Sequence, residues 1–459
     1  MDKTNHHSRF LALRKAYPYF VYQSYSILRT KTSLRLKFSF DLAGHYTFRP
    51  ELEVPLRDFY LMDSLPEKVL NNLVFHMGMV ELISYWKAAC PPVVRVLAGH
   101  LDEEQVSWWK KLYFHGLGEF FYLNGIETDA DSFMQIVSEG ETYPVSTRVL
   151  NKKNVLVPVG GGKDSVVTLE LLKNSAFDVK PFLLNPREAS LRTIEIAGYQ
   201  PEKSVVVWRT LDPLLLQLNA SGFLNGHTPF SALLAFVSAF TALLSGTRYI
   251  ALSNESSANE STVPGSKVNH QYSKSFEFEQ DFDRYVKRYI HPGLDYFSFL
   301  RPLNELQIAA LFSRFPQHHF SFRSCNVGSK TDSWCGACPK CLFTYVMLSP
   351  FLPQAKLEKI FGKNLLKEET LKPIMKQLDG TVAVKPFECV GTPEEVNAAL
   401  FHVKEKGLQT GDLRLLQRDV ASGNGQREFG ALLKQINHAH FLPDKFLSVL
   451  LKALAHVAV

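Results

Sequence analysis

The sequence lacks a strong excess of charge of either sign. Its 51 Lys and Arg and 45 Asp and Glu residues give a formal net charge of +6 over 459 residues. A balance this mild does not indicate a nucleic-acid-binding protein, although it favours an anionic ligand. Internal repeats and low-complexity tracts are also missing, and 12% of the residues are aromatic. We therefore expect packed domains rather than disorder, and no nucleic acid as a partner.

Long hydrophobic runs are scarce as well. The first residues contain no apolar stretch of the kind found in secretory signals. One uncharged segment, 229–246, is about as long as a short membrane span. Serine and threonine interrupt it, and a strand-like run at 249–252 follows directly. We expect a buried helix there, in a soluble and cytoplasmic protein without a membrane partner.

Cysteine is infrequent, and four of the six cysteines lie close together. Such clustering differs from the spread-out framework of secreted disulfide proteins. The spacing suits a tetrahedral Zn²⁺ site, which would be structural because four thiolates leave no position open for water. An iron–sulfur cluster is the alternative. The predicted ligands are Cys325, Cys335, Cys338 and Cys341.

The middle of the chain has the pattern of an α/β fold. Short apolar runs at 155–159, 182–184, 205–208 and 249–252 alternate with helical segments. Such alternation predicts a parallel, doubly wound sheet with helices on both faces. We assign this domain, including the cysteine cluster, to residues 149–345.

The flanking regions differ in character. Residues 1–148 predict an α+β domain, with a strand at 34–40 and a possible partner strand at 19–27. Helices are predicted from near Ser64 and Pro66 to Trp86, and from Asp102 to Asn124-Gly125.

The sequence pattern of residues 346–459 predicts a mainly helical region. Thr392 and Glu395 form a capping-box pattern, and Gly407 marks the end of that helix.

The most informative motif is a glycine turn between a predicted strand and a predicted helix. Glycine lets the backbone approach a phosphate closely, and the first amides of a helix bind anions. The lysine adds a positive charge, and the aspartate can hold Mg²⁺ beside the phosphates. We therefore expect a nucleotide at Gly160, Gly161, Gly162, Lys163, Asp164 and Ser165.

This turn is neither a Walker loop nor a dinucleotide fingerprint. It resembles the Ser-Gly-Gly-x-Asp-Ser signature of the ATP pyrophosphatases, the PP-loop enzymes, with Gly160 in place of the first serine. The resemblance implies a PP-loop nucleotide-binding fold and the cleavage of ATP to AMP and pyrophosphate. It places the adenine near 182–185, where Asn185-Pro186-Arg187 forms a plausible loop.

A cysteine knuckle after the sheet also resembles 7-cyano-7-deazaguanine synthase, but that smaller enzyme lacks the long region ahead of the loop. Four features together resemble the UDP-N-acetylmuramoyl-L-alanyl-L-glutamate epimerase family. They are the glycine turn, Asn-Glu-Ser-Ser-Ala-Asn-Glu at 254–260, Trp-Cys-Gly-Ala-Cys-Pro-Lys-Cys at 334–341, and the N-terminal region.

That resemblance implies a specific reaction on a UDP-sugar dipeptide. ATP, with Mg²⁺, would adenylate the carboxylate of the terminal L-glutamate and release pyrophosphate. The adenylate acidifies the neighbouring Cα–H, so that a base removes the proton and an acid returns one to the opposite face. Hydrolysis then gives D-glutamate and AMP. We predict His227 and Glu255 as the catalytic pair.

Three other functions remain open at this point. A PP-loop ligase or amidase would pass the adenylate to an amine, and a tRNA-modifying enzyme would need a basic, aromatic surface. A regulatory module would bind ATP without releasing pyrophosphate.

Overall fold

The computed structural model describes residues 5–61, 65–263, 265, 268–270, 272–406 and 425–456. The chain divides into two compact units, each assembled from separate stretches of sequence. The N-terminal unit comprises residues 1–156, 205–250 and 267–296, and the C-terminal unit comprises 157–204, 251–266 and 297–459. The predicted domain boundaries after residues 148 and 345 stay a prediction.

The described strands belong to one mixed sheet of eleven. Their order is β11-β10-β7-β8-β9-β4-β2-β1-β5-β6, with β3 paired to β2. The strands are β1 (Tyr19–Arg29), β2 (Ser33–Leu42), β3 (Tyr46–Phe48), β4 (Glu51–Pro55), β5 (Val93–Val96), β6 (Gln135–Ser138), β7 (Asn151–Pro158), β8 (Asp178–Leu184), β9 (Val205–Thr210), β10 (Thr247–Leu252) and β11 (Asp295–Ser298).

The predicted α/β class is confirmed, but the prediction of a parallel sheet is correct only in part. β7 pairs with β10 in parallel, and β5 pairs with β1 and with β6 in parallel. In contrast, β1 to β4 form antiparallel pairs, and β4 joins β9 antiparallel. The turns at 30–32, 43–45 and 49–50 are too short for the crossover that parallel neighbours require.

The helices supply the remaining layers of both units. They are α1 (His7–Ala16), α2 (Glu67–Trp86), α3 (Glu103–Gly116), α4 (Gly118–Leu123), α5 (Lys163–Lys173), α6 (Glu188–Ile196), α7 (Pro213–Ala220), α8 (Phe230–Leu244), α9 (Phe276–Tyr289), α10 (Glu305–Ser313), α11 (Pro339–Leu348), α12 (Gln354–Phe361), α13 (Lys372–Leu378), α14 (Pro393–Glu405), α15 (Gly425–Leu432) and α16 (Asp444–Leu454).

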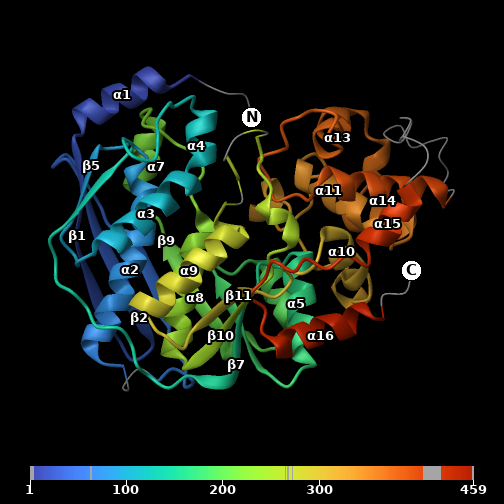
Figure 1. The fold of residues 1–459 in the computed structure, drawn as a ribbon, viewed down its shortest axis with the longest axis horizontal. Coiled ribbons are helices and arrows are strands. Elements are labelled where there is room, and N and C mark those ends of the chain that lie inside the picture. The colour runs from blue at the N-terminus through green and yellow to red at the C-terminus, as the bar shows by residue number, and fades with distance from the viewer. Residues whose placement is uncertain are drawn as a thin grey trace. The chain divides into compact units, whose positions relative to one another are not determined.

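The core of the N-terminal unit lies beneath α2. This helix packs on β1 and β2 and against α8, as Figure 1 shows. Nearly every α2 side chain from Asn72 to Trp86 is buried. Within this core His76 lies between the carbonyl oxygen of Asn72, 2.7 Å from Nδ1, and the hydroxyl of Tyr285, 2.9 Å from Nε2.

The predicted buried helix at 229–246 is confirmed as α8, which is buried along most of its length and leads directly into β10. Within the described part of the chain, no helix has both the length and the apolar composition needed to cross a bilayer.

Two predicted helix ends differ in detail. The helix predicted from Asp102 to Asn124 is two helices, α3 and α4, separated at Leu117. Glycine is a poor helix former, and Gly116 and Gly118 flank the break. Asp102 caps α3 as predicted, in a capping box with Gln105.

The start of α2 falls at Glu67, so Pro66 is the capping residue rather than part of the first turn. Ser64 lies outside the described residues. The capping box of Thr392 and Glu395 is confirmed at the start of α14, and Gly407 lies beyond the described range.

Candidate active site

The glycine turn connects the end of β7 to the first residue of α5, as predicted (Figure 1). Gly160 is exposed, and the side chain of Asp164 retains 33% of its accessible surface. The first amides of a helix have no partner within the helix, and the helix dipole is positive at this end. The turn is therefore open to a ligand and has the polarity that a phosphate group requires.

Gly161 is the residue that fixes the shape of the turn. Its φ is +86°, and a Cβ there would lie 2.7 Å from the carbonyl carbon of Ala189 and 2.8 Å from the amide nitrogen of Ser190. Its amide donates to the hydroxyl of Ser165 over 3.2 Å. The start of α6 therefore packs directly on the turn, at a distance that only glycine permits.

Lys163 lies beneath the turn in an acidic environment. α5 and α10 pack side by side (Figure 1), and the Nζ atom of Lys163 donates to the carboxylates of Asp164 and Glu305. Burial lowers the pKa of Lys163, but attraction to Asp164 and Glu305 outweighs burial, so the pKa lies above its usual value. Lys163 therefore carries a positive charge next to the turn.

Two further buried glutamates surround this pair. Both carboxylate oxygens of Glu395 accept backbone hydrogen bonds, from Glu305 over 2.7 Å and from Thr392 over 2.5 Å. Burial raises the pKa of Glu395, and the nearby carboxylate of Glu255 raises it further. Burial raises the pKa of Glu305 well above its usual value and attraction to Lys163 opposes this, while the carboxylates of Asp164, Glu255 and Glu395 raise it further. Four carboxyl groups, including that of Asp164, therefore share this region with Lys163.

The loop that carries Glu255 follows β10 and is anchored on both sides. The guanidinium of buried Arg301 donates to the carbonyl oxygen of Glu255 over 2.6 Å, and Asn254 donates to the hydroxyl of Ser298 over 3.0 Å. Glu255 itself is 5% exposed. The predicted polar loop is thus a fixed element of the C-terminal unit, in which Glu255 faces the carboxylate cluster.

The predicted cysteine site has the dimensions of a tetrahedral metal centre. The Sγ–Sγ distances are 3.8 Å for Cys325–Cys338, 3.7 Å for Cys335–Cys341 and 3.5 Å for Cys338–Cys341. A tetrahedron with metal–sulfur bonds of about 2.3 Å has edges of roughly 3.8 Å. Disulfide sulfurs lie about 2 Å apart, so these thiols are not bonded in pairs. The residues present fit a zinc ion.

The cysteine site borders the glycine turn. The amide of Arg323, two residues before Cys325, donates to the carbonyl oxygen of Gly161 over 2.8 Å. A Cβ on Gly162 would lie 3.0 Å from the hydroxyl of Ser324. Ordering of the cysteine site therefore also positions one wall of the turn.

The loop predicted to face the adenine lies between β8 and α6. Asn185 there has a φ of +47°, a conformation that asparagine tolerates better than most residues. The segment leads into Ala189 and Ser190, the residues that touch Gly161. Its position is consistent with the predicted role, which stays a prediction.

The two predicted catalytic residues belong to different units. Glu255 is in the C-terminal unit with the glycine turn, and His227 is in the N-terminal unit. There the Nδ1 atom of His227 lies 3.5 Å from a carboxylate oxygen of Glu119, and the imidazole of His270 contacts the same oxygen.

Comparison with known families identifies the chain. The family model described as the MurL N-terminal domain matches residues 12–299, and that of the MurL C-terminal domain matches residues 321–427. The chain belongs to the MurL family. The membership inferred from the motifs is thereby confirmed.

Curated relatives of this MurL family member support the same family assignment. Three proteins named UDP-N-acetyl-alpha-D-muramoyl-L-alanyl-L-glutamate epimerase match most of the chain. One from Xanthomonas oryzae pv. oryzae is 36% identical over 332 residues, or 71% of this chain and 72% of the relative. One from a Micromonospora species is 34% identical over 399 residues, or 84% of this chain and 87% of the relative. One from Salinispora tropica is 36% identical over 345 residues, or 73% of this chain and 74% of the relative.

No solved structure matches the chain. As a member of an epimerase family, it is an enzyme of the isomerase class.

Sequence reasoning missed several residues of this MurL chain. Glu305 precedes an apolar helical stretch, and a lone carboxylate at the start of such a helix was the available signal. Glu395 was recognised only as a capping residue. Glu119 and His270 have no motif around them, and only the fold brings them to His227.

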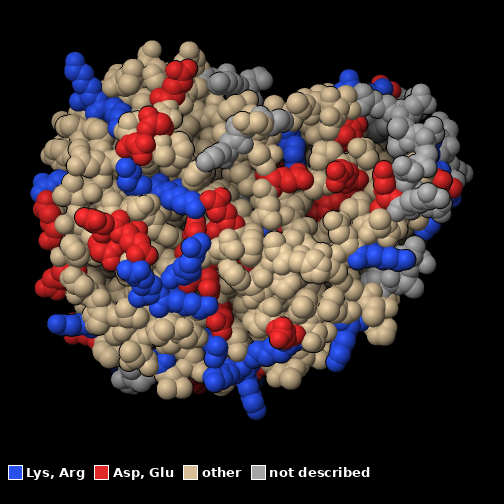
Figure 2. Space-filling view, in the orientation of Figure 1, with Lys and Arg blue, Asp and Glu red and all other residues tan. Residues whose placement is uncertain are grey.

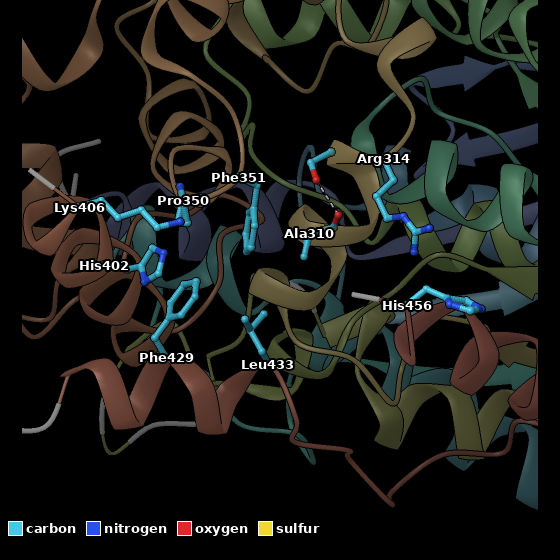
Figure 3. Close-up of a pocket in the computed structure, with 10 residues that line it drawn as sticks. Ala310, Arg314, Pro350, Phe351, His402, Lys406, Phe429, Leu433 and His456 are labelled. Atoms are coloured by element: carbon cyan, nitrogen blue, oxygen red, sulfur yellow. Dashed lines mark hydrogen bonds between the residues drawn. The ribbon is translucent and has the colours of Figure 1, made fainter. Parts of the chain in front are cut away.

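The C-terminal unit also contains a cavity of about 340 Å³ (Figure 3). Arg314, at the end of α10, and Lys406, after α14, contribute positive charge, and the rings of His402 and Phe429 stack with centroids 4.0 Å apart. Arg314 lies roughly 13 Å along the axis of α10 from Glu305, at 1.5 Å per residue.

Charges on the face shown in Figure 2 are of both signs over α3 and α9. Lys111 pairs with Asp281 at 2.6 Å and with Glu277 at 2.7 Å, and Arg288 pairs with Glu104 at 2.7 Å. Over these helices the positive charges are matched by acids, which is not the pattern of a surface for a polyanion.

Proposed function

We propose that this chain catalyses the ATP-dependent epimerisation of the terminal L-glutamate of UDP-N-acetylmuramoyl-L-alanyl-L-glutamate. The product would be the D-glutamate epimer, a precursor of peptidoglycan made in the cytoplasm. The substrate is the one named for the curated relatives. The observation that carries the ATP dependence is the open glycine turn at the positive end of α5, with Lys163 beneath it.

The turn would hold the phosphates of ATP through the amides at the start of α5. Lys163 would exchange its contact with Glu305 for one with a phosphate oxygen. Asp164 and the neighbouring carboxylates suit Mg²⁺, a cation that prefers oxygen ligands and binds beside phosphates. The excess of carboxyl groups would otherwise repel a bare triphosphate.

The first step would activate the substrate. A carboxylate oxygen of the terminal glutamate attacks the α-phosphorus of ATP, and the bond from that phosphorus to the bridging oxygen breaks. Pyrophosphate leaves, and the glutamate becomes an acyl-adenylate. The electron-withdrawing acyl group makes the Cα–H more acidic than it is next to a carboxylate.

Proton transfer would follow at that carbon. One group removes the proton from Cα, and another returns a proton to the opposite face. Glu255 and His227 are our proposed pair. Glu255 is supported by its placement in the same unit as the turn and by the anchored loop that holds it. Water then hydrolyses the acyl-adenylate to AMP and the D-glutamate product.

The cysteine cluster would hold a structural Zn²⁺ ion. With four thiolate ligands the ion would keep no position for substrate, so its contribution is to fix the segment that supports the turn. This role is distinct from the Mg²⁺ that accompanies ATP.

The decisive experiment incubates the enzyme with ATP, Mg²⁺ and the UDP-linked L-Ala-L-Glu substrate in deuterated water. Chiral analysis and mass spectrometry of the product are combined with assays for AMP and pyrophosphate. We expect D-glutamate with one deuterium on Cα, and AMP formed in step with it.

Two of the competing functions give different results in this experiment. A ligase or amidase would yield a product that has gained a nitrogen, and a regulatory module would bind ATP without forming pyrophosphate. Epimerisation without AMP would overturn the adenylation step, and a product without deuterium would overturn proton exchange with solvent.

A further inference from the structure

Three metal-ligating side chains converge in the N-terminal unit, away from every motif in the sequence. Glu119 lies on α4 (Figure 1), His227 lies in the loop before α8, and His270 lies in the segment before α9. One ligand atom from each lies within 4.8 Å of the other two. We propose that these residues form a binding site for a divalent transition-metal ion, separate from the cysteine site and from the Mg²⁺ of the proposed reaction.

The positions of the donor atoms support this proposal. The Nδ1 atoms of His270 and His227 approach the same oxygen of Glu119, at 2.5 Å and 3.5 Å. Around an ion with bonds of about 2.1 Å, three donors lie roughly 3 to 3.5 Å apart. Small side-chain rotations would therefore place one ion between all three.

The charge of the cluster also supports a bound cation. Glu119 is only 7% exposed, and its described partners are the two imidazoles, with no Lys or Arg side chain paired to it among the described residues. A buried carboxylate without a compensating charge is costly. A divalent cation bound between the three side chains would supply such a charge.

The loop that carries His227 is held in place by contacts within the protein. Lys87 donates to the side-chain oxygen of Asn225 over 3.0 Å, and Asn124 donates to its carbonyl oxygen over 3.2 Å. A Cβ on Gly226 would lie 2.9 Å from the ring of Phe120, so the loop packs tightly on α4. Such fixed support is what an effective metal site requires around its ligands.

The ligand set indicates the class of ion. Two imidazoles and one carboxylate suit Zn²⁺, Mn²⁺, Fe²⁺ or Co²⁺ rather than Ca²⁺ or Mg²⁺. The side chain of His227 retains 27% of its surface, so solvent reaches the cluster. An ion bound through Nδ1 of His227 would leave that atom no lone pair for proton transfer. If the ion binds there, His227 is a metal ligand and not a member of the proposed proton-transfer pair, so the metal titration decides between these two roles for His227.

The test is a Co²⁺ titration of the metal-free, full-length protein, followed by absorption spectroscopy. Thiolate ligands give an intense near-ultraviolet charge-transfer band, whereas nitrogen and oxygen ligands give only weak visible bands. We expect each chain to bind two Co²⁺ ions, one that gives the thiolate band and one that does not. Metal content measured after Zn²⁺ loading and dialysis should agree.

Three variants assign the second equivalent. His270→Ala and Glu119→Gln, which keeps the shape of the side chain, should lose the equivalent without the thiolate band and keep the other. His100→Ala, a substitution of an exposed histidine in the same unit, should bind like the unmodified protein. Circular dichroism checks that each variant is folded.

A single equivalent in the unmodified protein, with the thiolate band, would overturn the proposal. So would a second equivalent that survives in both His270→Ala and Glu119→Gln. Neither outcome depends on the epimerase assay, so failure of this proposal is distinguishable from failure of the proposed function.

Discussion

The ammonium group of Lys163 is hydrogen-bonded to the carboxylate of Glu305, a residue 142 positions further along the chain. Both side chains are 4% exposed. The contact joins the start of α5 to the start of α10, and thus ties the glycine turn to the carboxylate cluster.

Replacing Glu305 with glutamine should destabilise the protein. The change removes one counter-charge from a buried ammonium group, and breaking a buried ion pair typically costs about 3 kcal/mol. We expect the free energy of unfolding, measured by urea denaturation, to fall by that amount. Glu394→Gln, an exposed change on α14, should alter it by less than about 0.5 kcal/mol. Equal effects of the two substitutions would show that the pair contributes little.

The two neighbouring glycines of the turn should respond differently to alanine. Gly161→Ala introduces a Cβ at positive φ and within 2.8 Å of two backbone atoms, so the turn must shift. We expect this variant to lose ATP binding, measured by calorimetry, and about 2 kcal/mol of stability. A Cβ on Gly160 meets nothing within 4 Å, so Gly160→Ala should stay folded and as stable as the parent. Normal ATP binding by Gly161→Ala would contradict the proposed phosphate contact.

Asp164→Ala should abolish pyrophosphate release while leaving the fold intact. The side chain is partly exposed at the turn, so its loss costs little packing, and Glu305 remains as a counter-charge for Lys163, so the variant should be less stable than the parent but folded. The proposed Mg²⁺ would lose a carboxylate ligand. A pyrophosphate assay with the UDP-linked substrate measures the effect. Asp178→Ala, which changes an exposed aspartate at the start of β8, serves as the control. Turnover at the parent rate in Asp164→Ala would mean that the metal is held elsewhere.

The sequence was sufficient for features that depend on local patterns. The glycine turn, the strand and helix that flank it, the buried α8 and the capping box of Thr392 all follow from periodicity and from residue types with strong backbone preferences. The family followed from motifs confined to residues 160–341, and the comparisons confirmed it.

What the sequence could not supply depends on contacts between distant segments. The antiparallel strands β1 to β4 join the rest of the sheet because β4 pairs with β9, which is far from it in the chain. Packing of α5 on α10 brings Glu305 to Lys163, and the fold of the N-terminal unit brings Glu119 to the loop that carries His227. No sequence motif identifies either contact.

The stability of the N-terminal unit should depend on pH through His76. Burial lowers the pKa of His76 to about 4, against roughly 6.5 in an unfolded chain. Below pH 6.5 the unfolded state therefore binds a proton at His76, whereas His76 in the folded state stays unprotonated until the pH approaches 4. The stabilising contribution is complete above pH 6.5 and is lost progressively as the pH falls toward 4.

The full contribution of His76 to the free energy of unfolding is about 3 kcal/mol. In His76→Gln the free energy of unfolding should therefore fall less steeply between pH 7 and pH 4.5 than in the parent. His100→Gln, at an exposed position, should keep the parental slope. Parallel curves for His76→Gln and the parent would show that His76 is not the titrating group.

Loss of the cysteine site should weaken ATP binding without any substitution in the turn itself. Hydrogen bonds from neighbouring cysteines, Cys341 first, lower the pKa of Cys338 to about 5, so this ligand is a thiolate at neutral pH. Cys338→Ala should remove one zinc equivalent per chain and release the segment whose Arg323 amide supports Gly161. We expect a several-fold higher Kd for ATP, with Cys389→Ala unchanged in both measurements. Zinc loss with unaltered ATP affinity would mean that the glycine turn keeps its shape without this support.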